Sequence, residues 1–263
     1  MMLLGFDRHD VRMAFNLARL GVRDRFLGST LGLVWVIFNP VLMFGIFTFV
    51  FGFVFQSKLP GAETSLTFVV WLISGYGPWL AISEGLTYGT ASVVSNSGII
   101  KNLPFKTELL PIVGVLMGLI PLAVALVFLI VVLWVEGSMP SLPWLIIPFA
   151  IVFQVLFISG LGLFLAALNV FVRDVFLVLP NVLLLVLFAS PIFYPIEAFP
   201  SVIRPLVLFN PFYVLTEAYR APLIRYSLPP LWTLVYLVIL AVLVFWAGLG
   251  FFRRLKSFFD SRL

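Results

Sequence analysis

Cysteine is absent from this sequence of 263 residues, and histidine occurs once, as His9. Without cysteine the chain can form neither a disulfide nor a thiolate metal site. One histidine is too few for a zinc site, and it lies away from any candidate nucleophile, which argues against a Ser–His–Asp triad. The acidic residues are isolated, so no carboxylate pair points to acid–base catalysis. These absences argue against an enzyme.

A phosphate-binding loop of the form GxxxxGK[ST] is also missing. The one Lys-Thr pair, Lys106-Thr107, follows Phe105, where that motif requires glycine. We therefore expect this chain itself to bind no nucleotide or other cofactor. The net charge of +5 does not indicate nucleic-acid binding, because the basic residues lie beside apolar runs rather than in one stripe with interleaved aromatic side chains.

Charged residues make up only 10% of the chain and hydrophobic residues 62%, against about 25% and 45–50% in soluble domains. A mean hydropathy of +1.18 requires many apolar side chains to face lipid. These runs are apolar on every side, unlike the alternating strands of a membrane barrel. The sequence predicts one all-α integral membrane domain, 1–263, with six transmembrane helices. The six apolar runs, each long enough to cross a bilayer, are 31–55, 66–91, 109–135, 142–172, 175–196 and 231–252.

The distribution of Lys and Arg predicts the orientation of these helices. One side of the membrane is predicted to carry the five Lys and Arg residues before the first run, Lys101, Lys106, Arg173 and the four after residue 252. The other side carries four. The positive-inside rule then places both termini in the cytoplasm. No apolar core with a small-residue cleavage site follows Met1, so we expect the first span to remain in the mature protein.

Residues 7–27 are predicted to form an amphipathic helix at the membrane surface. Arg8, Arg12, Arg19 and Arg23 fall within an arc of roughly 60° on a helix that turns 100° per residue. Such an arginine stripe meets anionic headgroups while the apolar side sinks into the acyl boundary. The stripe either only anchors the chain or also handles an anionic lipid substrate, and the sequence leaves both interpretations open.

The segment 92–108, between the second and third runs, is too polar to lie in lipid. Its centre nonetheless carries apolar residues that a freely solvated loop would not need. We expect a short helix, bounded by Gly98 and Pro104, that docks into a groove of a partner; the alternative is that the segment folds against its own subunit. The residues predicted to make this contact are Gly98, Ile99, Ile100, Lys101, Leu103, Pro104 and Phe105.

The segment 191–230, after the fifth run, contains eight prolines, so no continuous helix can cover it. Residues 202–219 are nevertheless mostly apolar. We expect two short helices that re-enter the outer leaflet beside a translocation path, because non-helical backbone at that depth needs protein or water around it. An ordinary external loop is the alternative.

Glu84 is the one charged residue well inside a long apolar run, where a charge costs about 2.5–3.5 kcal/mol on insertion scales. It is expected to face a partner or a polar cavity. Several aromatic residues lie beside helix-breaking prolines and could line the path, stacking against sugar rings. Interfacial belts or core packing are the alternative role for each of them. These aromatic residues are Trp35, Tyr76, Trp79, Phe193, Tyr194 and Tyr213.

Several motifs follow one another along the chain: the interfacial helix, Leu27-Gly28, Leu31-Gly32-Leu33-Val34-Trp35 before Asn39-Pro40, the segment 96–111, Arg173-Asp174, Ser190-Pro191-Ile192-Phe193-Tyr194-Pro195, and Asn210-Pro211 followed by Arg220. Together they resemble the membrane subunit of bacterial polysaccharide-export ABC transporters, which move lipid-linked O-antigen, capsule or teichoic acid. The resemblance covers nearly the whole chain.

The resemblance implies a homodimer in the bacterial inner membrane, with two ATP-binding cassette subunits beneath it that hold ATP and magnesium. The segment 92–108 would be the coupling helix that rests in a cleft of the ATPase. The arginine stripe would draw the diphosphate linkage of the lipid carrier toward Leu27 and Gly28 at the channel entrance. The chain would then be a permease for a lipid-linked polysaccharide.

Two other functions remain open at this point. A related permease for a small drug or a lipid would share the same architecture. A membrane enzyme acting on polyprenyl-linked substrates should carry acidic or histidine clusters at a membrane face, and the sequence shows none.

Overall fold

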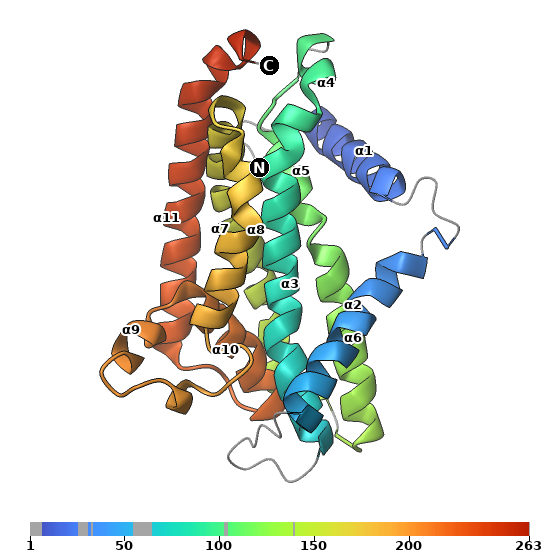
Figure 1. Ribbon diagram of the computed structural model, residues 1–263, viewed down its shortest axis with the longest axis vertical. Helices are drawn as coiled ribbons and strands as arrows, with labels where there is room; N and C mark the ends of the chain where they lie inside the picture. Colours follow the sequence, from blue (N-terminus) through green and yellow to red (C-terminus); the bar gives the residue numbers. More distant parts are fainter. Residues whose placement is uncertain are drawn as a thin grey trace.

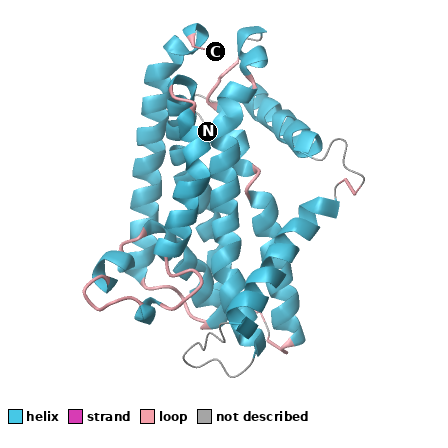
Figure 2. Ribbon diagram, viewed as in Figure 1, coloured by secondary structure: helices cyan, strands magenta, loops and turns pink. Residues whose placement is uncertain are grey.

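The computed structural model describes residues 7–25, 31–32, 34–54, 65–102, 105–138 and 140–262, and every regular element in these ranges is a helix (Figures 1 and 2). The α-helices are α1 Arg8–Arg25, α2 Val34–Phe47, α3 Ser65–Ser95, α4 Ser97–Asn102, α5 Leu109–Leu116, α6 Leu119–Val135, α7 Ile146–Phe171, α8 Asp174–Ala189, α9 Arg204–Leu208, α10 Pro211–Ile224 and α11 Leu231–Leu255. Shorter helical turns are the π-helix η2 Thr48–Val54 and the 3₁₀ turns η3 Leu142–Leu145, η4 Ile196–Ala198 and η5 Lys256–Ser261.

The long helices form a bundle with two distinct ends (Figure 1). The short helix α4 and the C-terminal part of α11 lie at one end, which we call the α4 end, and α1 lies obliquely beside the bundle near it. The helices α9 and α10 lie at the opposite end, which we call the α9 end. The segments predicted to dock with a partner and to re-enter the outer leaflet therefore lie at opposite ends of the molecule.

Four helical stretches are long and apolar enough to cross a membrane: Val34–Gly52, Leu109–Val135, Leu142–Phe171 and Leu231–Phe259. Two further helices occupy the remaining predicted runs. The helix α3 has 31 residues but is less apolar, because its sequence includes several glycines and polar residues, and α8 is apolar with 16 residues. The described part of the chain is thus all-helical with four candidate spans, and the count of six stays a prediction.

Several boundaries differ from those that hydrophobicity predicted. The run 109–135 is two helices, α5 and α6, separated at Met117 and Gly118. A Cβ on Gly118 would overlap the carbonyl of Ala81, so this break brings the chain against α3. The run 175–196 is helical only to Ala189, because Pro191 restrains Ser190 to an extended conformation. Hydrophobicity marks apolar segments but does not locate helix ends.

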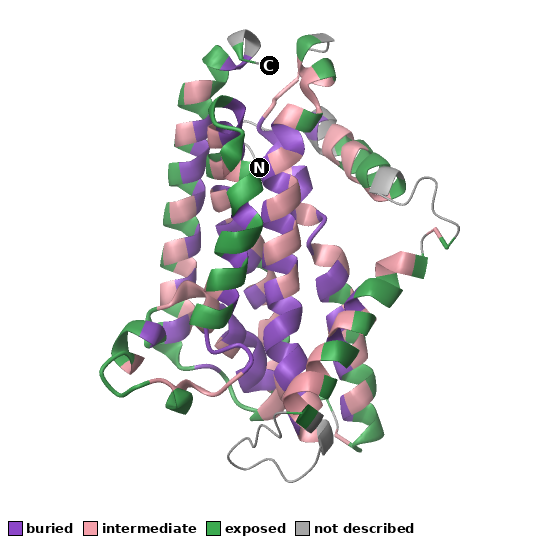
Figure 3. Cartoon of the chain, in the orientation of Figure 1, coloured by how far each residue is buried: buried purple, intermediate pink, exposed green. Residues whose placement is uncertain are grey.

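The centre of the bundle is built on α3, which packs against α5, α6, α7 and α10, while α7 also packs along α11. Buried residues concentrate on α3 and on the inward faces of its neighbours (Figure 3). Where α7 crosses α11, a Cβ on Gly248 would overlap the carbonyl of Gly160, so glycine permits this close contact. The outward faces keep large exposed apolar residues, such as Leu177 and Leu185 of α8, that suit lipid or another apolar surface.

Candidate functional site

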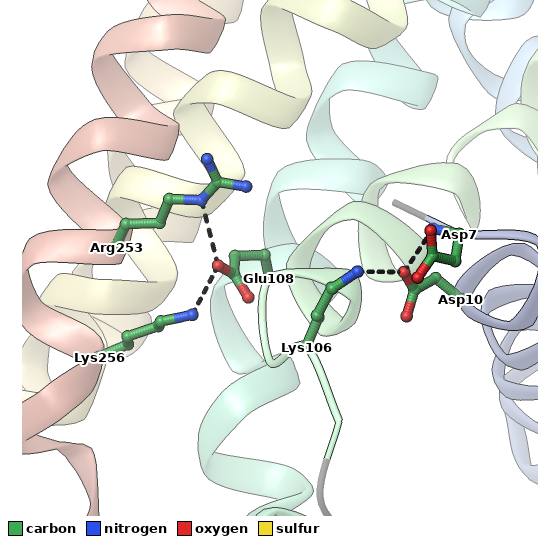
Figure 4. A network of polar contacts seen from close by, with 6 residues as sticks. All are labelled: Asp7, Asp10, Lys106, Glu108, Arg253 and Lys256. Atoms are coloured by element: carbon green, nitrogen blue, oxygen red, sulfur yellow. Dashed lines mark hydrogen bonds and ion pairs between the residues drawn. The ribbon is translucent and has the colours of Figure 1, made fainter. Parts of the chain in front are cut away.

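A polar network at the α4 end joins three helices through the loop between α4 and α5 (Figure 4). Lys106 lies in this loop, and its Nζ is 2.5 Å from Asp10 Oδ2 of α1. The backbone N–H of Asp7 donates to the same oxygen at 2.7 Å. The loop that follows α4 is therefore tied to the amphipathic helix α1.

The other half of the network ties the start of α5 to the end of α11 (Figure 4). Glu108 is buried, and its Oε1 accepts from Lys256 Nζ at 2.9 Å and from Arg253 Nε at 3.2 Å. Burial alone raises the pKa of Glu108, but hydrogen bonds from Lys256, its own backbone N–H and Arg253, with the charge of Lys256, lower it below the ordinary value. Glu108 is therefore a carboxylate at neutral pH.

The predicted docking residues fall on this side of the molecule, but they do not share one helix. The helix α4 ends at Asn102, so Phe105 lies beyond it in the following bend. Gly98 and Lys101 are exposed, whereas Ile99 and Ile100 are half-buried by the chain itself. Leu103 and Pro104 lie outside the described residues. Docking to a partner stays a prediction, with Gly98 and Lys101 as its exposed part.

A cavity of about 370 Å³ lies beneath α1, between it and the helices α3 and α5. Leu17, Leu20 and Gly21 contribute its α1 wall, and Tyr88, Ser92 and Asn96 lie on the α3 side. Both apolar and hydroxyl- or amide-bearing residues thus line a space of the size of small-molecule sites, roughly 300–1,000 Å³. The amphipathic helix covers this cavity with its apolar side.

The arginine stripe lies on the other side of α1. Arg12, Arg19 and Arg23 are exposed and do not line the cavity. The side chain of Arg8, and both Leu27 and Gly28, lie outside the described residues. The stripe's role at a channel entrance stays a prediction.

Two of the predicted path aromatics meet in one buried cluster near the α9 end. Phe193 stacks on Phe47 and Phe51 with ring centroids 4.6 and 4.8 Å apart, and Tyr76 lies 5.3 Å from Phe193. Phe193 and Tyr76 are both buried within the subunit. We call these four rings the Phe193 cluster. Phe47 and Phe51 are half-buried, but the two predicted residues are packed inside the subunit, so a lining role requires the cluster to open and stays a prediction.

The other aromatics predicted to line the path are dispersed. Trp79 is buried against Phe212, Trp35 pairs with Phe38, and the Tyr194 hydroxyl donates to the Phe188 carbonyl. Tyr213 is half-buried and lines a second cavity at the α9 end. Glu84 is half-buried on α3, and its expected position facing a partner or a polar cavity stays a prediction.

Arg220 of α10 is the most notable residue whose structural role the sequence did not reveal. It is fully buried, and its Nη1 and Nη2 donate to the carbonyls of Pro191 and Ile192 at 2.8 and 2.6 Å. Its guanidinium lies 3.9 Å from the centroid of the Trp71 ring, a cation–π contact. The loop that contains Phe193 is therefore anchored, through Arg220, to the helices α10 and α3.

Two further contacts hold the same region. Asn210 caps α10 by accepting from the Phe212 N–H at 2.9 Å, and its Nδ2 donates to Ser190 Oγ at 2.9 Å. Inside the bundle, Tyr219 Oη donates to Gln154 Oε1 at 2.6 Å, and Gln154 Nε2 donates to the Pro78 carbonyl at 3.0 Å. Arg220 and Gln154 are polar residues within apolar segments, where a polar side chain without a partner is costly. That pattern indicates that each has a partner, although it does not identify the partner.

Nothing in the described ranges gathers three His, Asp or Glu side chains that could hold a metal ion. The features that the described residues form are packed helices, salt bridges and cavities.

Comparison with known proteins agrees with this arrangement. The chain is 27% identical to the O-antigen export system permease protein RfbA of Klebsiella pneumoniae, over 96% of this chain and 99% of the relative. It is 26% identical to RfbA of Myxococcus xanthus over 95% of each chain. It is 22% identical to the polysialic acid transport protein KpsM of Escherichia coli, over 88% of this chain and 89% of KpsM.

A family-level match leads to the same group. The pattern of the ABC-2 type transporter family matches residues 16–224, which run from the middle of α1 to the end of α10. The match therefore includes the cavity beneath α1, the helix α4, the Phe193 cluster and Arg220. Because it covers well over half of the chain, this protein belongs to the ABC-2 type transporter family.

Proposed function

We propose that this chain is the membrane-spanning permease subunit of an ATP-driven exporter that moves a lipid-linked polysaccharide out of a bacterial cell. The observation that carries the proposal is near-full-length similarity to permeases named for O-antigen export and polysialic acid transport. Cavities and packed helices suit a transport subunit, and the energy source is assigned to a separate ATPase.

The proposed topology has six crossings of the inner membrane. They are α2 with η2, α3, α5 with α6, η3 with α7, α8, and α11. An even number of crossings places both termini on the same side of the membrane. The basic residues after residue 252, which lie with α1 and α4 at the α4 end, support the cytoplasm as that side. The short helices α9 and α10 would then dip into the outer leaflet from the external side.

The proposed assembly is a homodimer above two ATP-binding cassette subunits, which hold ATP and magnesium. The helix α4 would rest on the ATPase with Gly98 and Lys101 toward it. The contacts of Lys106 with Asp10 and of Glu108 with Arg253 and Lys256 support a coupling role, because they tie the loop after α4 to α1 and α11. A movement of α4 would then reach both helices.

The entrance for the lipid carrier would lie beside α1. The cavity beneath α1 offers apolar walls for part of the lipid, and the exposed Arg12, Arg19 and Arg23 offer cations near its diphosphate. Each basic residue near the surface contributes roughly 1 kcal/mol of attraction to an anionic membrane. Both features support entry from the cytoplasmic leaflet at this helix.

Site-directed crosslinking tests the proposal, since the chain has no cysteine of its own. Lys101→Cys places a thiol on the exposed part of α4, and Ser201→Cys places a matched exposed thiol at the α9 end. With a cysteine–lysine crosslinker, an ATP-binding cassette subunit should attach at position 101 and not at 201. Attachment at 201, or an actively exporting complex with none at 101, would contradict the assignment.

A further inference from the structure

A second cavity, of about 390 Å³, opens at the α9 end between α10 and the start of α11. Tyr213 and Glu217 of α10, Arg225 and Ser227 of the following loop, and Trp232 and Thr233 of α11 all line it. Apart from Tyr213, none of these six residues was singled out from the sequence as a candidate site residue. We call this space the Trp232 cavity.

The chemistry of the Trp232 cavity combines two aromatic side chains with a charged pair. Trp232 is 46% exposed and Tyr213 is half-buried, so both offer ring surface to a ligand. Glu217 Oε2 accepts from Arg225 Nη2 at 2.5 Å, which makes the pair neutral overall. A carboxylate has about four acceptor sites and a guanidinium five donors, so one mutual bond leaves capacity for hydroxyl groups. Flat apolar rings beside paired hydrogen-bonding groups match the alternating C–H faces and hydroxyls of a sugar ring.

The walls of the cavity are held in place by contacts outside it. The Tyr236 hydroxyl donates to the Phe209 carbonyl at 2.6 Å, and the Phe209 ring lies 6.3 Å from that of Trp232. The Ser227 N–H donates to the Ala221 carbonyl at 3.2 Å. Tyr226, between Arg225 and Ser227, has a φ of 50°, a conformation that non-glycine residues rarely adopt. A pre-formed site with local backbone strain is typical of ligand binding.

We propose that the Trp232 cavity is a carbohydrate subsite that holds a neutral sugar unit of the exported polymer at the external side of the permease. The inference rests on the proposed function, because that function supplies the polymer and places the α9 end outside. The volume lies within the range of small-molecule sites, roughly 300–1,000 Å³. The neutral Glu217–Arg225 pair favours an uncharged sugar over an acidic one.

The competing role for Trp232 and Tyr213 is an interfacial aromatic belt, and the chain offers a matched control for it. Trp134 lies in the last turn of the long helix α6 and is 75% exposed, and it does not line the cavity. A belt role predicts the same effect for Trp134→Ala and Trp232→Ala. A sugar site predicts an effect only for residues of the cavity.

The test measures binding of short, lipid-free oligosaccharides, cut from the surface polysaccharide of the host strain, to the purified permease complex in nanodiscs. Trp232→Ala and Tyr213→Ala should each weaken binding about tenfold, the loss expected when one aromatic contact worth about 1.4 kcal/mol is removed. Trp232→Phe should retain most of the affinity because it keeps a ring, which separates a lost contact from misfolding. Trp134→Ala should bind like the unmodified protein.

The same preparation is assayed in parallel for ATP-driven transport of the lipid-linked polymer. If the unmodified complex transports the polymer but binds no free oligosaccharide, or if the cavity variants bind normally, the carbohydrate subsite is wrong and the proposed function stands. If the unmodified complex transports no polysaccharide, the proposed function itself is wrong.

Discussion

Arg220 is a buried cation that two backbone carbonyls and the face of Trp71 hold in place. The two carbonyls belong to Pro191 and Ile192, directly before Phe193. Through these contacts one side chain of α10 determines where the central ring of the Phe193 cluster lies. At the scale of single residues, Arg220 therefore links the α9 end to this aromatic cluster.

Arg220→Lys should destabilise this region although it keeps the charge. A single ammonium group cannot reproduce the planar fork that reaches two carbonyls and stacks on Trp71, so at least one charged hydrogen bond is lost. We expect a loss of about 1.5–3 kcal/mol, seen as a thermal unfolding midpoint lowered by several degrees in detergent. Arg204→Lys is the matched control, because Arg204 also donates to two loop carbonyls, of Phe199 and Glu197, but is more accessible to solvent. If Arg220→Lys and Arg204→Lys lower the unfolding midpoint equally, the burial of Arg220 does not explain its contribution to stability.

Gly75→Ala tests the same contact from the side of α3. A Cβ at position 75 would lie 2.5 Å from Arg220 Nη2, so the guanidinium must shift from the position in which it donates to the two carbonyls. The variant should lower the unfolding midpoint and reduce export, because the Phe193 loop loses its anchor. Gly250→Ala in α11 adds the same methyl group where no atom lies within 4 Å. It should leave export unchanged and should not lower the unfolding midpoint, because alanine favours a helix more than glycine does. If Gly75→Ala has the same unfolding midpoint and export as the unmodified protein, the contacts of Arg220 do not depend on glycine at position 75.

Part of this residue-scale picture was accessible from the sequence. Tyr76 and Phe193 were grouped because both are aromatic and lie near prolines, and the structure brings them together. The partners of Arg220 and Gln154 could not be predicted, because these contacts join residues far apart in the chain. The cap that Asn210 forms on α10 is local, and the Asn-Pro pair at 210–211 is a typical helix start.

At the scale of elements, the predicted apolar runs correspond to helices, since length and hydrophobicity are properties of the local sequence. The helix α1 lies within the segment 7–27, and its place at the membrane surface stays a prediction. The helices α9 and α10 lie in the proline-rich region after α8, and their re-entry into the outer leaflet stays a prediction. The break between α5 and α6 at Met117 and Gly118 precedes Pro121, whose nitrogen has no hydrogen to donate to the Met117 carbonyl. The sequence therefore contains a signal for the break, but none for the close approach of Gly118 to Ala81. Tertiary contacts of this kind leave no signal in one sequence.

Glu108 connects two elements, and its replacement should weaken their contact at the α4 end. The paired double variant Arg253→Ala and Lys256→Ala leaves a buried carboxylate without cations, whereas Glu108→Gln removes the charge and leaves two cations with partial access to solvent. The double variant should therefore lose more stability, by about 1.5–3 kcal/mol, than Glu108→Gln. Thermal unfolding of the three proteins measures this order. If the double variant is as stable as the unmodified protein, the contacts of Glu108 with Arg253 and Lys256 do not stabilise the α4 end.

The same link has a defined pH dependence. Because the pKa of Glu108 is lowered in the folded protein, the contact contributes its full stability above the ordinary glutamate pKa of about 4.3 and loses it as pH falls below that value. The unfolding midpoint of the unmodified protein should exceed that of Glu108→Gln by a constant amount between about pH 6 and pH 8. The difference should shrink only under strongly acidic conditions. A difference that vanishes at neutral pH would show that Glu108 is not held as a carboxylate.

At the scale of the whole molecule, the two ends differ in chemistry, and the basic residues at the α4 end determine the proposed orientation. The α4 end carries the links among α1, α5 and α11, and the α9 end carries the Trp232 cavity. An impermeant thiol reagent should label Ser201→Cys in intact cells, and should label Lys101→Cys only after the inner membrane is opened. Labelling of both in intact cells, or the reverse pattern, would contradict the topology of six crossings with cytoplasmic termini.

The most direct test of the account is ATP-driven transport by the purified permease together with the ATP-binding cassette subunit that crosslinks at position 101. Both proteins are reconstituted in liposomes, and lipid-linked polysaccharide is supplied on the side that carries the ATPase. The account predicts that the polysaccharide reaches the opposite side only when ATP is hydrolysed, and that Gly75→Ala slows this transfer while Gly250→Ala does not. ATP hydrolysis without any transfer of polysaccharide would contradict the central claim that this chain is a polysaccharide-export permease.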